Sequence, residues 1–533
     1  MTKRIIINKF KHIKSPVLAA ISGLLIVLAL PPFPFYFLAF IALVPFIYIL
    51  IRNNFFLCFS TGFVFGLILN LGILYWLAGN QGTTWYFAFL SMLGAVLILA
   101  VQYGILGITI GFIGRRLGKE ILLWSLPVLF GAFEFITAQG VLGFTWNSLC
   151  YTQTSNIIPA QIASIFGCYG ISFWIVLVNV LLYKVASNFF KRKKVVGTII
   201  ILTIVILLPY LYGFLDLNSN HHNANGNKIT VGLVQPNVDP NEKWNHAAFR
   251  ENMNTLYALS DSVTAQENLD LLVWPETAIP AYLRYRKWLH REIHEYISQK
   301  EVSLLTGAPD FVKLDSNNYN FYNSTFFMTA AKTKIESYNK IRLVPFGEKI
   351  PLSNIFEVLE NINLGQGNFD AGDSIKLFEV PLKNNDNLKS RKNVLVSSAI
   401  CYESGFSDLV RGGVRKGAQL LVIVTNDAWF GNTSAPYLHA AIAKLRAIEN
   451  NIPIVRAANT GVSTIIDSRG RTVKKCGFEQ RGYATSQLNL RSKRTIFSRM
   501  GYYFNYLLVG ISIILLGFCY ISPGSNRKKE ELL

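Results

Sequence analysis

The stretch Val394-Leu-Val-Ser-Ser-Ala-Ile-Cys-Tyr-Glu-Ser-Gly405 joins an apolar run to a turn, and Cys401 stands at the junction. A short apolar run bounded by turn residues predicts a buried strand, so this cysteine is presented at a strand end. Two further runs end in the same way and lead to Glu276 and Lys340, after Leu271-Leu-Val-Trp-Pro275 and Tyr338-Asn339. A thiol, a carboxylate and an amine at strand ends are the components of a nucleophilic acyl-transfer site.

The rest of the chain is too apolar for a protein that is soluble throughout, because 51% of its 533 residues are hydrophobic and only 15% are charged. Apolar stretches near the length of a membrane-spanning helix predict eight spans. They cover residues 16–34, 36–51, 55–78, 86–113, 121–138, 158–189, 196–215 and 502–521. The first stretch lacks a small-residue cleavage site and lies too late for a removable signal peptide, so we expect a retained anchor.

Basic residues occur in alternate loops between these stretches, as expected for loops on the cytoplasmic side of a membrane. They are Lys3, Arg4, Lys9, Lys11, Lys14, Arg52, Arg115, Arg116, Lys119, Lys184, Lys191, Arg192, Lys193, Lys194, Arg527, Lys528 and Lys529. The pattern predicts cytoplasmic termini and places the polar insert 217–498 on the opposite face. Since these segments account for most of the net charge of +20, the charge reflects topology and no nucleic-acid partner is expected.

Two of the six cysteines lie in the polar insert, Cys401 and Cys476, and the others lie in or beside apolar stretches at Cys58, Cys150, Cys168 and Cys519. A disulfide between the first two is one reading in an oxidising compartment. We favour free thiols, because a bridge would disable the best nucleophile in the chain.

Within the insert, short strands alternate with helical stretches, which predicts a two-layered α/β domain of about 270 residues. The predicted strands are 228–235, 269–274, 303–307, 322–329, 394–400, 420–425, 454–457 and 463–467. The predicted helices are 246–266, 285–300, 404–416 and 436–450. The Asn-rich stretch 383–392 is expected to form a loop.

Four motifs in the insert resemble the nitrilase superfamily. They are Trp274-Pro-Glu-Thr277, Lys340-Ile-Arg-Leu-Val-Pro-Phe-Gly-Glu348, Cys401-Tyr-Glu403 and Thr425-Asn-Asp-Ala-Trp-Phe-Gly431. The resemblance implies an α-β-β-α sandwich whose catalytic residues are Glu276, Lys340 and Cys401. It includes no metal or cofactor, and the histidines show no metal-ligand spacing.

Together with eight membrane helices, these motifs resemble the apolipoprotein N-acyltransferase family over nearly the whole chain. The resemblance implies three regions: spans one to seven in 1–216, a periplasmic catalytic domain in 217–498, and the last span with a cytoplasmic tail in 499–533. It also implies a monomer in the bacterial inner membrane. The implied reaction moves an acyl chain from a membrane phospholipid to the N-terminal α-amino group of the diacylglyceryl-cysteine of an apolipoprotein.

The membrane part departs from the family pattern at one position. An Arg usually follows the glutamate of the fifth span by three residues, but here Glu134 is followed by Thr137, and the next motif reads Gly143-Phe-Thr-Trp146. An ionisable group at membrane depth is costly and is usually functional or partnered. Glu134 and Trp146 are therefore candidates for substrate binding, and a carboxyl that bonds a neighbouring helix is the alternative for Glu134.

The residue types predict a mechanism through a thioester. The start of helix 404–416 and the charge of Lys340 are expected to lower the pKa of the Cys401 thiol. Glu276 is the expected general base, and Lys340 is expected to stabilise the oxyanion. The predicted reaction is ping-pong: Cys401 takes the acyl chain from a phospholipid and then passes it to the amine.

Four supporting residues are predicted around this triad. By resemblance Glu348 supports the lysine or the nucleophile, and the alternative is a solvated loop carboxylate. Glu403 matters to activity by resemblance, although an acid at a helix start is also favoured electrostatically. Asn323 is expected to help the oxyanion, and Tyr402, which follows Cys401, is also predicted as a supporting residue.

Aromatic residues complete the predicted site. Trp244 matches a family motif and is a candidate for substrate binding, as is Trp429, whose loop with Phe430 follows strand 420–425. A second group is expected to form either an arm over a lipid entrance or an interfacial anchor. It contains Tyr282, Tyr285 and Trp288.

Two other classes of protein remain open at this point. A membrane-tethered amidase or nitrilase would use the same triad but would need no more than one anchor. A scaffold or transporter would account for the spans and for Glu134, but it would leave Glu276, Lys340 and Cys401 unexplained.

Overall fold

The computed structural model describes residues 15–52, 55–80, 82–219, 228–245, 247–315, 318–350, 368–383, 393–490 and 493–521. These residues divide into two compact units. One contains the chain up to Tyr75, Leu90–Leu215 and the chain from Tyr502, and the other contains Trp76–Phe89 and Asp216–Gly501. The basic residues near both termini and most of the Asn-rich stretch 383–392 lie outside the described residues.

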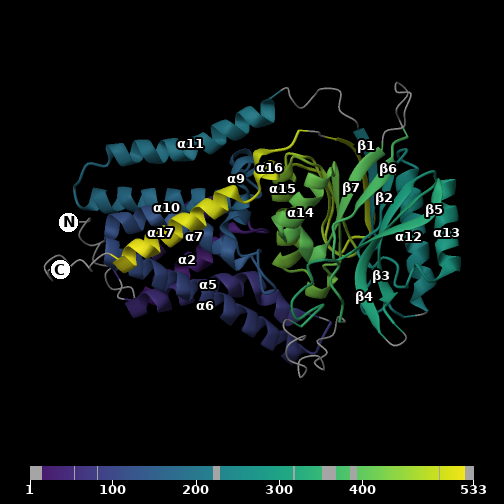
Figure 1. The fold of residues 1–533 in the computed structure, drawn as a ribbon, viewed down its shortest axis with the longest axis horizontal. Coiled ribbons are helices and arrows are strands. Elements are labelled where there is room, and N and C mark those ends of the chain that lie inside the picture. The colour runs from purple at the N-terminus through teal and green to yellow at the C-terminus, as the bar shows by residue number, and fades with distance from the viewer. Residues whose placement is uncertain are drawn as a thin grey trace. The chain divides into compact units, whose positions relative to one another are not determined.

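The first unit is helical, as Figure 1 shows, and its long helices are apolar. Among the described residues, six helical segments are long and apolar enough to cross a membrane. They are α5 (Phe55–Leu74) with η2 (Tyr75–Gly79), α6 (Trp85–Leu117), α7 (Lys119–Thr137), α10 (Cys168–Phe190), α11 (Val196–Asn218) and α17 (Tyr503–Ile521). These helices fit a membrane protein and coincide with six of the eight predicted spans.

The other two predicted spans contain shorter helices. Stretch 16–34 holds α2 (Ser15–Ala29), and stretch 36–51 holds η1 (Tyr36–Leu38), α3 (Ala39–Ala42) and α4 (Val44–Leu50). Between α7 and α10 the chain forms the short helices η3 (Leu149–Gln153), α8 (Ile157–Ala160) and α9 (Ala163–Phe166). The total of eight spans therefore stays a prediction.

The second unit contains two six-stranded sheets. The first has the order β12-β1-β2-β3-β4-β5, formed by β1 (Lys228–Gln235), β2 (Leu271–Val273), β3 (Ser303–Lys313), β4 (Tyr319–Thr329), β5 (Lys332–Asn339) and β12 (Gly482–Asn489). The second has the order β11-β10-β9-β8-β7-β6, formed by β6 (Leu377–Pro381), β7 (Asn393–Ile400), β8 (Leu420–Thr425), β9 (Ile454–Ala458), β10 (Ser463–Ile466) and β11 (Thr472–Cys476). Each sheet has a parallel centre, β1-β2-β3 in one and β7-β8-β9 in the other.

Helices cover the outer face of each sheet, so this unit has four layers. Figure 1 shows α12 (Ala248–Thr264) and α13 (Lys287–Gln299) beside the first sheet, and α14 (Ser407–Lys416) and α15 (Ser434–Asn450) beside the second. Buried side chains form one core between the sheets and one core under each helix pair. The two layers predicted from the strand pattern are therefore wrong, and the α-β-β-α sandwich implied by the resemblance is observed.

The strands that the sequence analysis did not predict lie at the edges of the two sheets. All eight predicted strands overlap observed ones, but β6, β11 and β12 were not predicted and β5 was noticed only at its end. These four are the edge strands of the two sheets. An edge strand needs no continuous apolar run, and β11, for example, has four exposed residues of five.

Candidate active site

The nucleophile candidate lies at a sharp turn. Cys401 follows β7 directly and opens the short 3₁₀ helix η6 (Cys401–Gly405), which is followed by α14. Its backbone has a φ of +52°, in the left-handed region that non-glycine residues seldom adopt. Such a conformation costs about 1–3 kcal/mol and persists only where the surroundings impose it. The predicted strand-end presentation of this thiol is observed.

Glu276 lies at the end of β2 and is buried. Asn323 of β4 donates a hydrogen bond from Nδ2 to Glu276 Oε1 at 2.7 Å. The turn that carries Glu276 packs closely on Gly307 of β3, where a Cβ atom would lie 2.7 Å from the Glu276 Cα. Only glycine allows this approach, so β3 contributes to the placement of the carboxylate.

Lys340 follows β5 and is also buried. Its Nζ lies 2.7 Å from Glu348 Oε2 and 2.8 Å from Oε1. Asn323 Nδ2 also donates to Glu348 Oε1, at 3.0 Å. A continuous chain of contacts therefore runs from Glu276 through Asn323 and Glu348 to Lys340, and Glu348 is not a solvated loop carboxylate.

The charges of the three candidates affect one another, which places them within electrostatic range. Burial raises the pKa of the Cys401 thiol, Glu276 raises it further, and Lys340 opposes both, with a net increase. Burial also raises the pKa of Glu276, against the charge of Lys340. Burial lowers the pKa of Lys340, but Glu348, Cys401 and Glu276 outweigh it and raise the pKa above its usual value. The predicted lowering of the thiol pKa is wrong, because burial outweighs the nearby cation.

Glu403 is fully buried beside the nucleophile turn. It accepts four hydrogen bonds, from Tyr338 Oη at 2.8 Å and from the backbone N–H groups of Ile341 at 2.7 Å, Arg342 at 3.1 Å and Ile400 at 2.7 Å. These contacts join the chain around Lys340 to the chain around Cys401. Tyr402 is buried, and its ring centroid lies 5.0 Å from that of Phe406.

The aromatic candidates differ in their exposure. Trp244 is 55% exposed on the loop after β1. Trp429 is half-buried in η7 (Ala428–Phe430), and Trp76 and Gly82 of the same unit lie close to η7. A Cβ atom at Gly82 would lie 3.2 Å from the Trp429 ring, and the rings of Trp76 and Phe430 are 4.2 Å apart between centroids.

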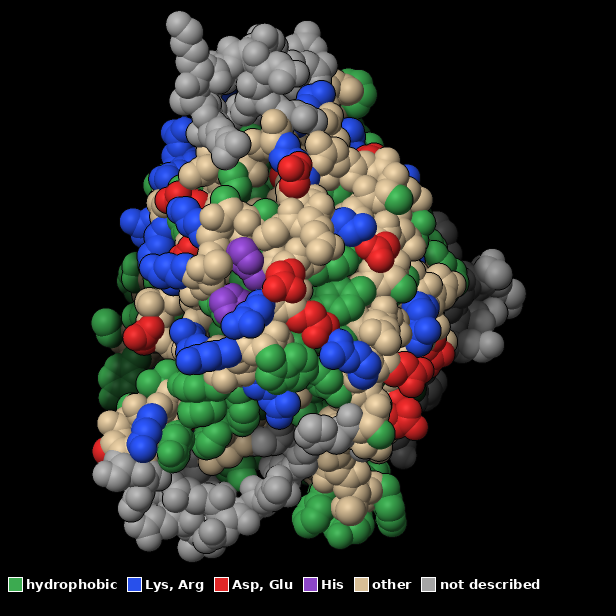
Figure 2. Space-filling model, turned by 90° about the vertical axis from the view of Figure 1, so that its right-hand side faces the viewer, with side chains coloured by type: hydrophobic (Ala, Val, Ile, Leu, Met, Phe, Trp, Pro, Cys, Tyr) green, Lys and Arg blue, Asp and Glu red, His purple; other side chains and the backbone are tan. Residues whose placement is uncertain are grey.

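The group Tyr282, Tyr285 and Trp288 lies partly on the surface. The rings of Tyr282 and Tyr285 pack on Phe311 of β3, with centroids 4.9 and 4.0 Å apart, while Trp288 packs on Phe249. Figure 2 shows hydrophobic side chains beside Lys and Arg side chains on the face of the molecule that includes the α13 side. The rings thus form part of a packed surface.

Two candidates belong to the helical unit. Glu134 is buried in α7, and its Oε1 accepts a hydrogen bond from the backbone N–H of Leu149 at 2.8 Å, where η3 begins. Trp146 is buried just before η3. The Glu134 carboxyl therefore has a structural partner within its own unit, as the alternative reading of this residue expected.

Several buried groups near the triad were missed by the sequence analysis. Lys243 donates from Nζ to the backbone carbonyl of Glu276 at 3.2 Å, and burial lowers its pKa to about 8, against the charge of Glu276. Asp427, His439 and Arg456 form a buried cluster behind Cys401. Asp427 lies within a quoted motif, but no local sequence pattern indicates that His439 or Arg456 would reach it.

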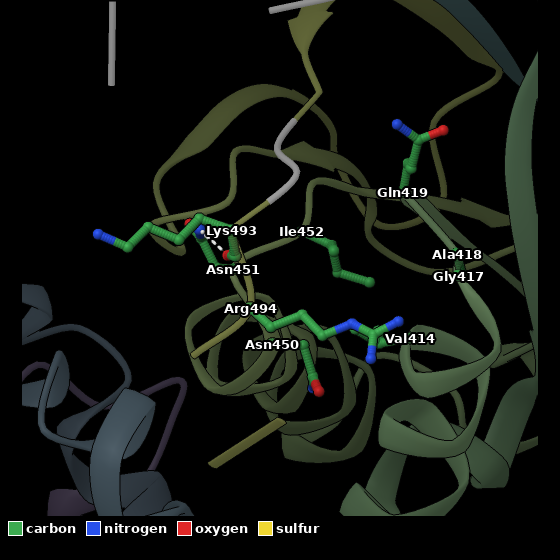
Figure 3. Close-up of a pocket in the computed structure, with 9 residues that line it drawn as sticks. All are labelled: Val414, Gly417, Ala418, Gln419, Asn450, Asn451, Ile452, Lys493 and Arg494. Carbon is green, nitrogen blue, oxygen red and sulfur yellow. Dashed lines mark hydrogen bonds between the residues drawn. The ribbon is translucent and has the colours of Figure 1, made fainter. Parts of the chain in front are cut away.

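A pocket of about 200 Å³ lies apart from the predicted site residues. Figure 3 shows its lining from the ends of α14 and α15 and from residues 493 and 494, and none of the predicted site residues is among them. Arg494 donates to the backbone carbonyl of Arg415 at 3.1 Å, so its guanidinium is engaged by the end of α14. Because Glu276, Lys340 and Cys401 are not among its lining residues, we assign this pocket no part in the reaction.

The described residues contain no group of three or more His, Cys, Asp or Glu side chains placed to hold a metal ion. Cys401 and Cys476 are both free thiols in the structure, so the alternative disulfide is not formed.

Comparison with known proteins defines the class of the α/β unit. Residues 230–496 match the family model described as carbon-nitrogen hydrolase, and residues 22–181 match the apolipoprotein N-acyltransferase N-terminal domain. The unit that contains Glu276, Lys340 and Cys401 is therefore a nitrilase-type catalytic domain, attached to a membrane-type helical unit.

Full-length relatives narrow this class to one family. The apolipoprotein N-acyltransferase of Geobacter metallireducens is 33% identical over 509 residues, which cover 94% of this chain and 95% of the relative. That of Chlorobaculum tepidum is 30% identical over 451 residues, covering 81% and 84%. The chain belongs to the apolipoprotein N-acyltransferase family, as the resemblance predicted, and is an acyltransferase. A solved amidase from Nesterenkonia sp. is 16% identical, with a TM-score of 0.36 over 49% of this chain and 90% of the amidase.

Proposed function

We propose that this enzyme transfers an acyl chain from a membrane phospholipid to the N-terminal α-amino group of the diacylglyceryl-cysteine of an apolipoprotein. Family membership supports the substrates. The observation that carries the mechanism is the chain of contacts that holds the buried Glu276 and Lys340 within electrostatic range of the partly buried Cys401 at its left-handed turn. A thiol, a carboxylate and an ammonium in one buried site supply a nucleophile, a base and an oxyanion partner.

The first half-reaction forms a thioester. Because the pKa of Cys401 is raised, the thiol is protonated at rest, and Glu276 takes its proton as sulfur attacks the acyl ester carbonyl. Lys340, whose raised pKa keeps it charged, stabilises the tetrahedral oxyanion. The intermediate collapses with loss of the lysophospholipid alkoxide, which receives the proton from Glu276. The enzyme then holds the acyl chain on Cys401.

The second half-reaction transfers the chain to nitrogen. The α-amino group of the apolipoprotein attacks the thioester carbonyl, and Glu276 takes a proton from the attacking amine. Collapse of the second oxyanion breaks the C–S bond, and the proton returns to the Cys401 sulfur. The products are an amide and a free thiol, so atoms and protons balance over the two steps.

The supporting residues have separate proposed roles. Glu348 and Asn323 hold Lys340 and Glu276 through the contacts described above, and Glu403 fixes the backbone on both sides of the site. Tyr402 supports the turn by packing on Phe406 next to Cys401. Substrates contact Trp244, Trp429, Glu134 and Trp146. No metal or cofactor takes part.

The proposed topology follows the charge pattern and the family. Eight spans cross the bacterial inner membrane, with spans one to seven in 1–216 and the last span in 499–533. Both termini lie in the cytoplasm, and the catalytic domain 217–498 lies on the periplasmic side. The enzyme acts as a monomer without a nucleic-acid partner.

The test of this function uses detergent-purified protein and phospholipid that carries a label in its acyl chain. The wild type should acquire a hydroxylamine-sensitive label without an acceptor, and Cys401→Ser should not. Cys476→Ser is the matched control, because this second free cysteine of the α/β unit lies at its own strand end on β11 and should leave labelling unchanged.

Addition of a diacylglyceryl-cysteine peptide separates the transferase from a hydrolase with the same triad. Label that moves to the amine of the peptide supports the proposed function. Release of free fatty acid at the same rate with and without peptide would identify an amidase-like hydrolase instead. A wild type that acquires no label from phospholipid would overturn the lipid-donor mechanism.

A further inference from the structure

A buried cluster of polar side chains contacts the backbone of the nucleophile from behind. The ring of His439, on α15, lies between two oxygen atoms: Nδ1 is 2.9 Å from Asp427 Oδ1, and Nε2 is 3.0 Å from the backbone carbonyl oxygen of Cys401. Ser404 Oγ lies 3.0 Å from the same Nε2 and 3.0 Å from the same carbonyl oxygen. His439, Asp427 and Ser404 are each at most 2% exposed.

Asp427 is itself held in place on its other side. Arg456 of β9 donates to Asp427 Oδ2 at 2.7 Å, and Thr425 of β8 donates to Oδ1 at 3.0 Å. Although burial opposes it, the charges of Arg456 and His439 hold the pKa of Asp427 below its usual range. The Asp427 carboxylate is therefore ionised and can only accept hydrogen bonds.

The chemistry of the acceptors fixes the orientation of the ring. Because Asp427 only accepts, Nδ1 of His439 carries a hydrogen. Nε2 then either donates to the Cys401 carbonyl, if the ring is charged, or accepts from the Ser404 hydroxyl, if it is neutral. A charged ring holds the Cys401 carbonyl directly, whereas a neutral ring, which burial favours by lowering the pKa of His439, holds the turn through the Ser404 hydroxyl. Both states connect Asp427 to the turn that carries Cys401.

We propose that Asp427 and His439 are positioning residues that hold the left-handed turn at Cys401, through its carbonyl or through Ser404, and so direct the Cys401 sulfur at the acyl carbonyl. The φ of +52° at Cys401 needs such support, because this backbone conformation is strained in a non-glycine residue. β7 and β8 are neighbouring parallel strands, so Cys401 and Asp427 leave the sheet at the same edge. The inference rests on the proposed thioester at Cys401.

The effect of this cluster should appear in the rate of the chemical step. A misplacement of about 1 Å at a reacting atom can cost roughly 10²-fold in rate. The hydrogen bonds of His439 described above reach Asp427, Ser404 and the backbone carbonyl of Cys401, none of which is proposed to bind substrate. The KM for phospholipid should therefore change little when His439 is replaced. The expected signature is a loss in the rate of thioester formation at unchanged KM.

The test compares His439→Leu with His439→Gln in the phospholipid labelling assay without acceptor. Leucine removes every polar contact of the ring, and we expect a fall of about 10²-fold in the labelling rate, with KM within about threefold. Glutamine keeps an amide near the position of Nε2 that can bond the Cys401 carbonyl or Ser404. We therefore expect it to restore at least about a tenth of the wild-type rate.

The control variant for a loss of buried polar contacts is Asp270→Asn. Asp270 is buried at the start of β2, the end of the strand opposite Glu276, and accepts from the backbone N–H groups of Thr230 and Lys383 at 2.8 Å each. This variant should lower the melting temperature and leave the labelling rate unchanged. Equal loss of labelling in Asp270→Asn and His439→Leu would overturn the inference, because it would assign the effect to general instability.

Iodoacetamide alkylation of Cys401 separates positioning from a change in thiol ionisation. A small reagent can reach the Cys401 sulfur from several directions, so its reaction does not depend on where the sulfur points. The rate of alkylation of His439→Leu should therefore stay close to the wild-type rate across pH. A parallel fall in alkylation and labelling would overturn the positioning role. If the wild type is labelled and His439→Leu is labelled at the same rate, only this inference is overturned. If the wild type is never labelled, the proposed function and this inference are overturned together.

Discussion

The two sheets of the α/β unit contribute to the candidate site in different ways. The first sheet supplies Glu276, Asn323 and Lys340, whose side chains contact one another directly or through Glu348. The second sheet supplies Cys401, and the polar groups around it, such as His439, contact its backbone. Under the proposed mechanism, the first sheet would control protons and charge, whereas the second would control the direction of the nucleophile.

The largest expected effect comes from removing the proposed base on the first sheet. Glu276→Gln keeps the shape of the side chain but cannot accept the thiol proton, so thioester formation should fall by about 10³-fold. The measurement is the initial rate of labelling from acyl-labelled phospholipid. A variant within tenfold of the wild type would show that another group takes the proton.

The wild type and Glu276→Gln also test how the rate of labelling depends on pH. Burial raises the pKa of Glu276 despite Lys340, so the carboxyl takes up its proton at a pH above the ordinary carboxyl range. As the pH falls through that value, the base is lost and wild-type labelling should decline. Glu276→Gln should lack this decline, and a decline that persists in the variant would belong to a different group. The second-sheet variants at His439 should keep the wild-type profile.

The next effect concerns the buried ion pair that holds Lys340. Glu348→Gln leaves the Lys340 ammonium buried without its carboxylate, and breaking such a pair costs about 3–5 kcal/mol of unfolding free energy. Labelling should also fall, by about 10- to 100-fold, because the oxyanion partner is no longer fixed. Both are measured on detergent-purified protein, by denaturant unfolding and by labelling.

Glu292→Gln is the matched control for this ion pair. Glu292 pairs with Arg250 on the surface, where an ion pair contributes at most about 1 kcal/mol. If the two glutamine variants lost the same stability, Lys340 and Glu348 would not form the buried pair described here.

The sequence predicted the first-sheet part of the site better than the second-sheet part. Glu276 follows an apolar run that predicts its strand, and Lys340 follows the end of β5, which was noticed in the sequence. On the second sheet, only the strand before Cys401 was visible in this way. His439 and Arg456 reach Asp427 from a helix and a strand distant in the chain, and no local pattern shows that convergence. In the fold, apolar runs revealed the central strands, while the edge strands lack such runs.

The pKa of Cys401 shows a second limit of sequence reasoning. The sequence correctly indicated a nearby lysine, and Lys340 does lower the pKa of the thiol. It gave no measure of burial, which acts in the opposite direction and outweighs the lysine. The sign of a pKa shift in a mixed site depends on desolvation, and desolvation is a property of the packed structure.

A smaller effect is expected at Lys243, which lies against the first-sheet base. Burial lowers its pKa from 10.5 to about 8, so the folded state disfavours the charged amine. This shift corresponds to at most about 3 kcal/mol of unfolding free energy. The protein lacks this stability below pH 8, where the lysine is charged in both states, and regains it as the pH rises from 8 to 10.5. Lys243→Met should therefore raise the unfolding free energy at pH 7, and its advantage should shrink at alkaline pH.

Labelling separates the functional from the structural role of Lys243. The lysine donates to the backbone carbonyl of Glu276, and its charge also lowers the pKa of that carboxyl. Lys243→Met should thus be more stable than the wild type but about tenfold slower in labelling. This is the result expected where an active-site residue supports activity and lowers the stability of the protein. A variant that gained stability without losing activity would exclude Lys243 from the first-sheet group.

The smallest expected effect comes from Tyr338→Phe, which tests how independent the two sheets are. Tyr338 of β5 donates to Glu403 beside the nucleophile, so this hydrogen bond joins the two sheets. Glu403 keeps its three backbone donors in the variant. The loss of one hydrogen bond to a carboxylate should therefore cost only about 1–2 kcal/mol of unfolding free energy.

If each sheet holds its own residues, labelling by Tyr338→Phe should stay within about twofold of the wild type, because neither the first-sheet contacts nor the His439 contact depends on the tyrosine hydroxyl. Denaturant unfolding and labelling of the same preparation measure both quantities. A loss of labelling comparable with that of Glu348→Gln would mean that the hydroxyl couples the two sheets. The proposed division, with charges controlled by the first sheet and the direction of the nucleophile by the second, would then fail. The single hydrogen bond between Tyr338 and Glu403 would control both properties.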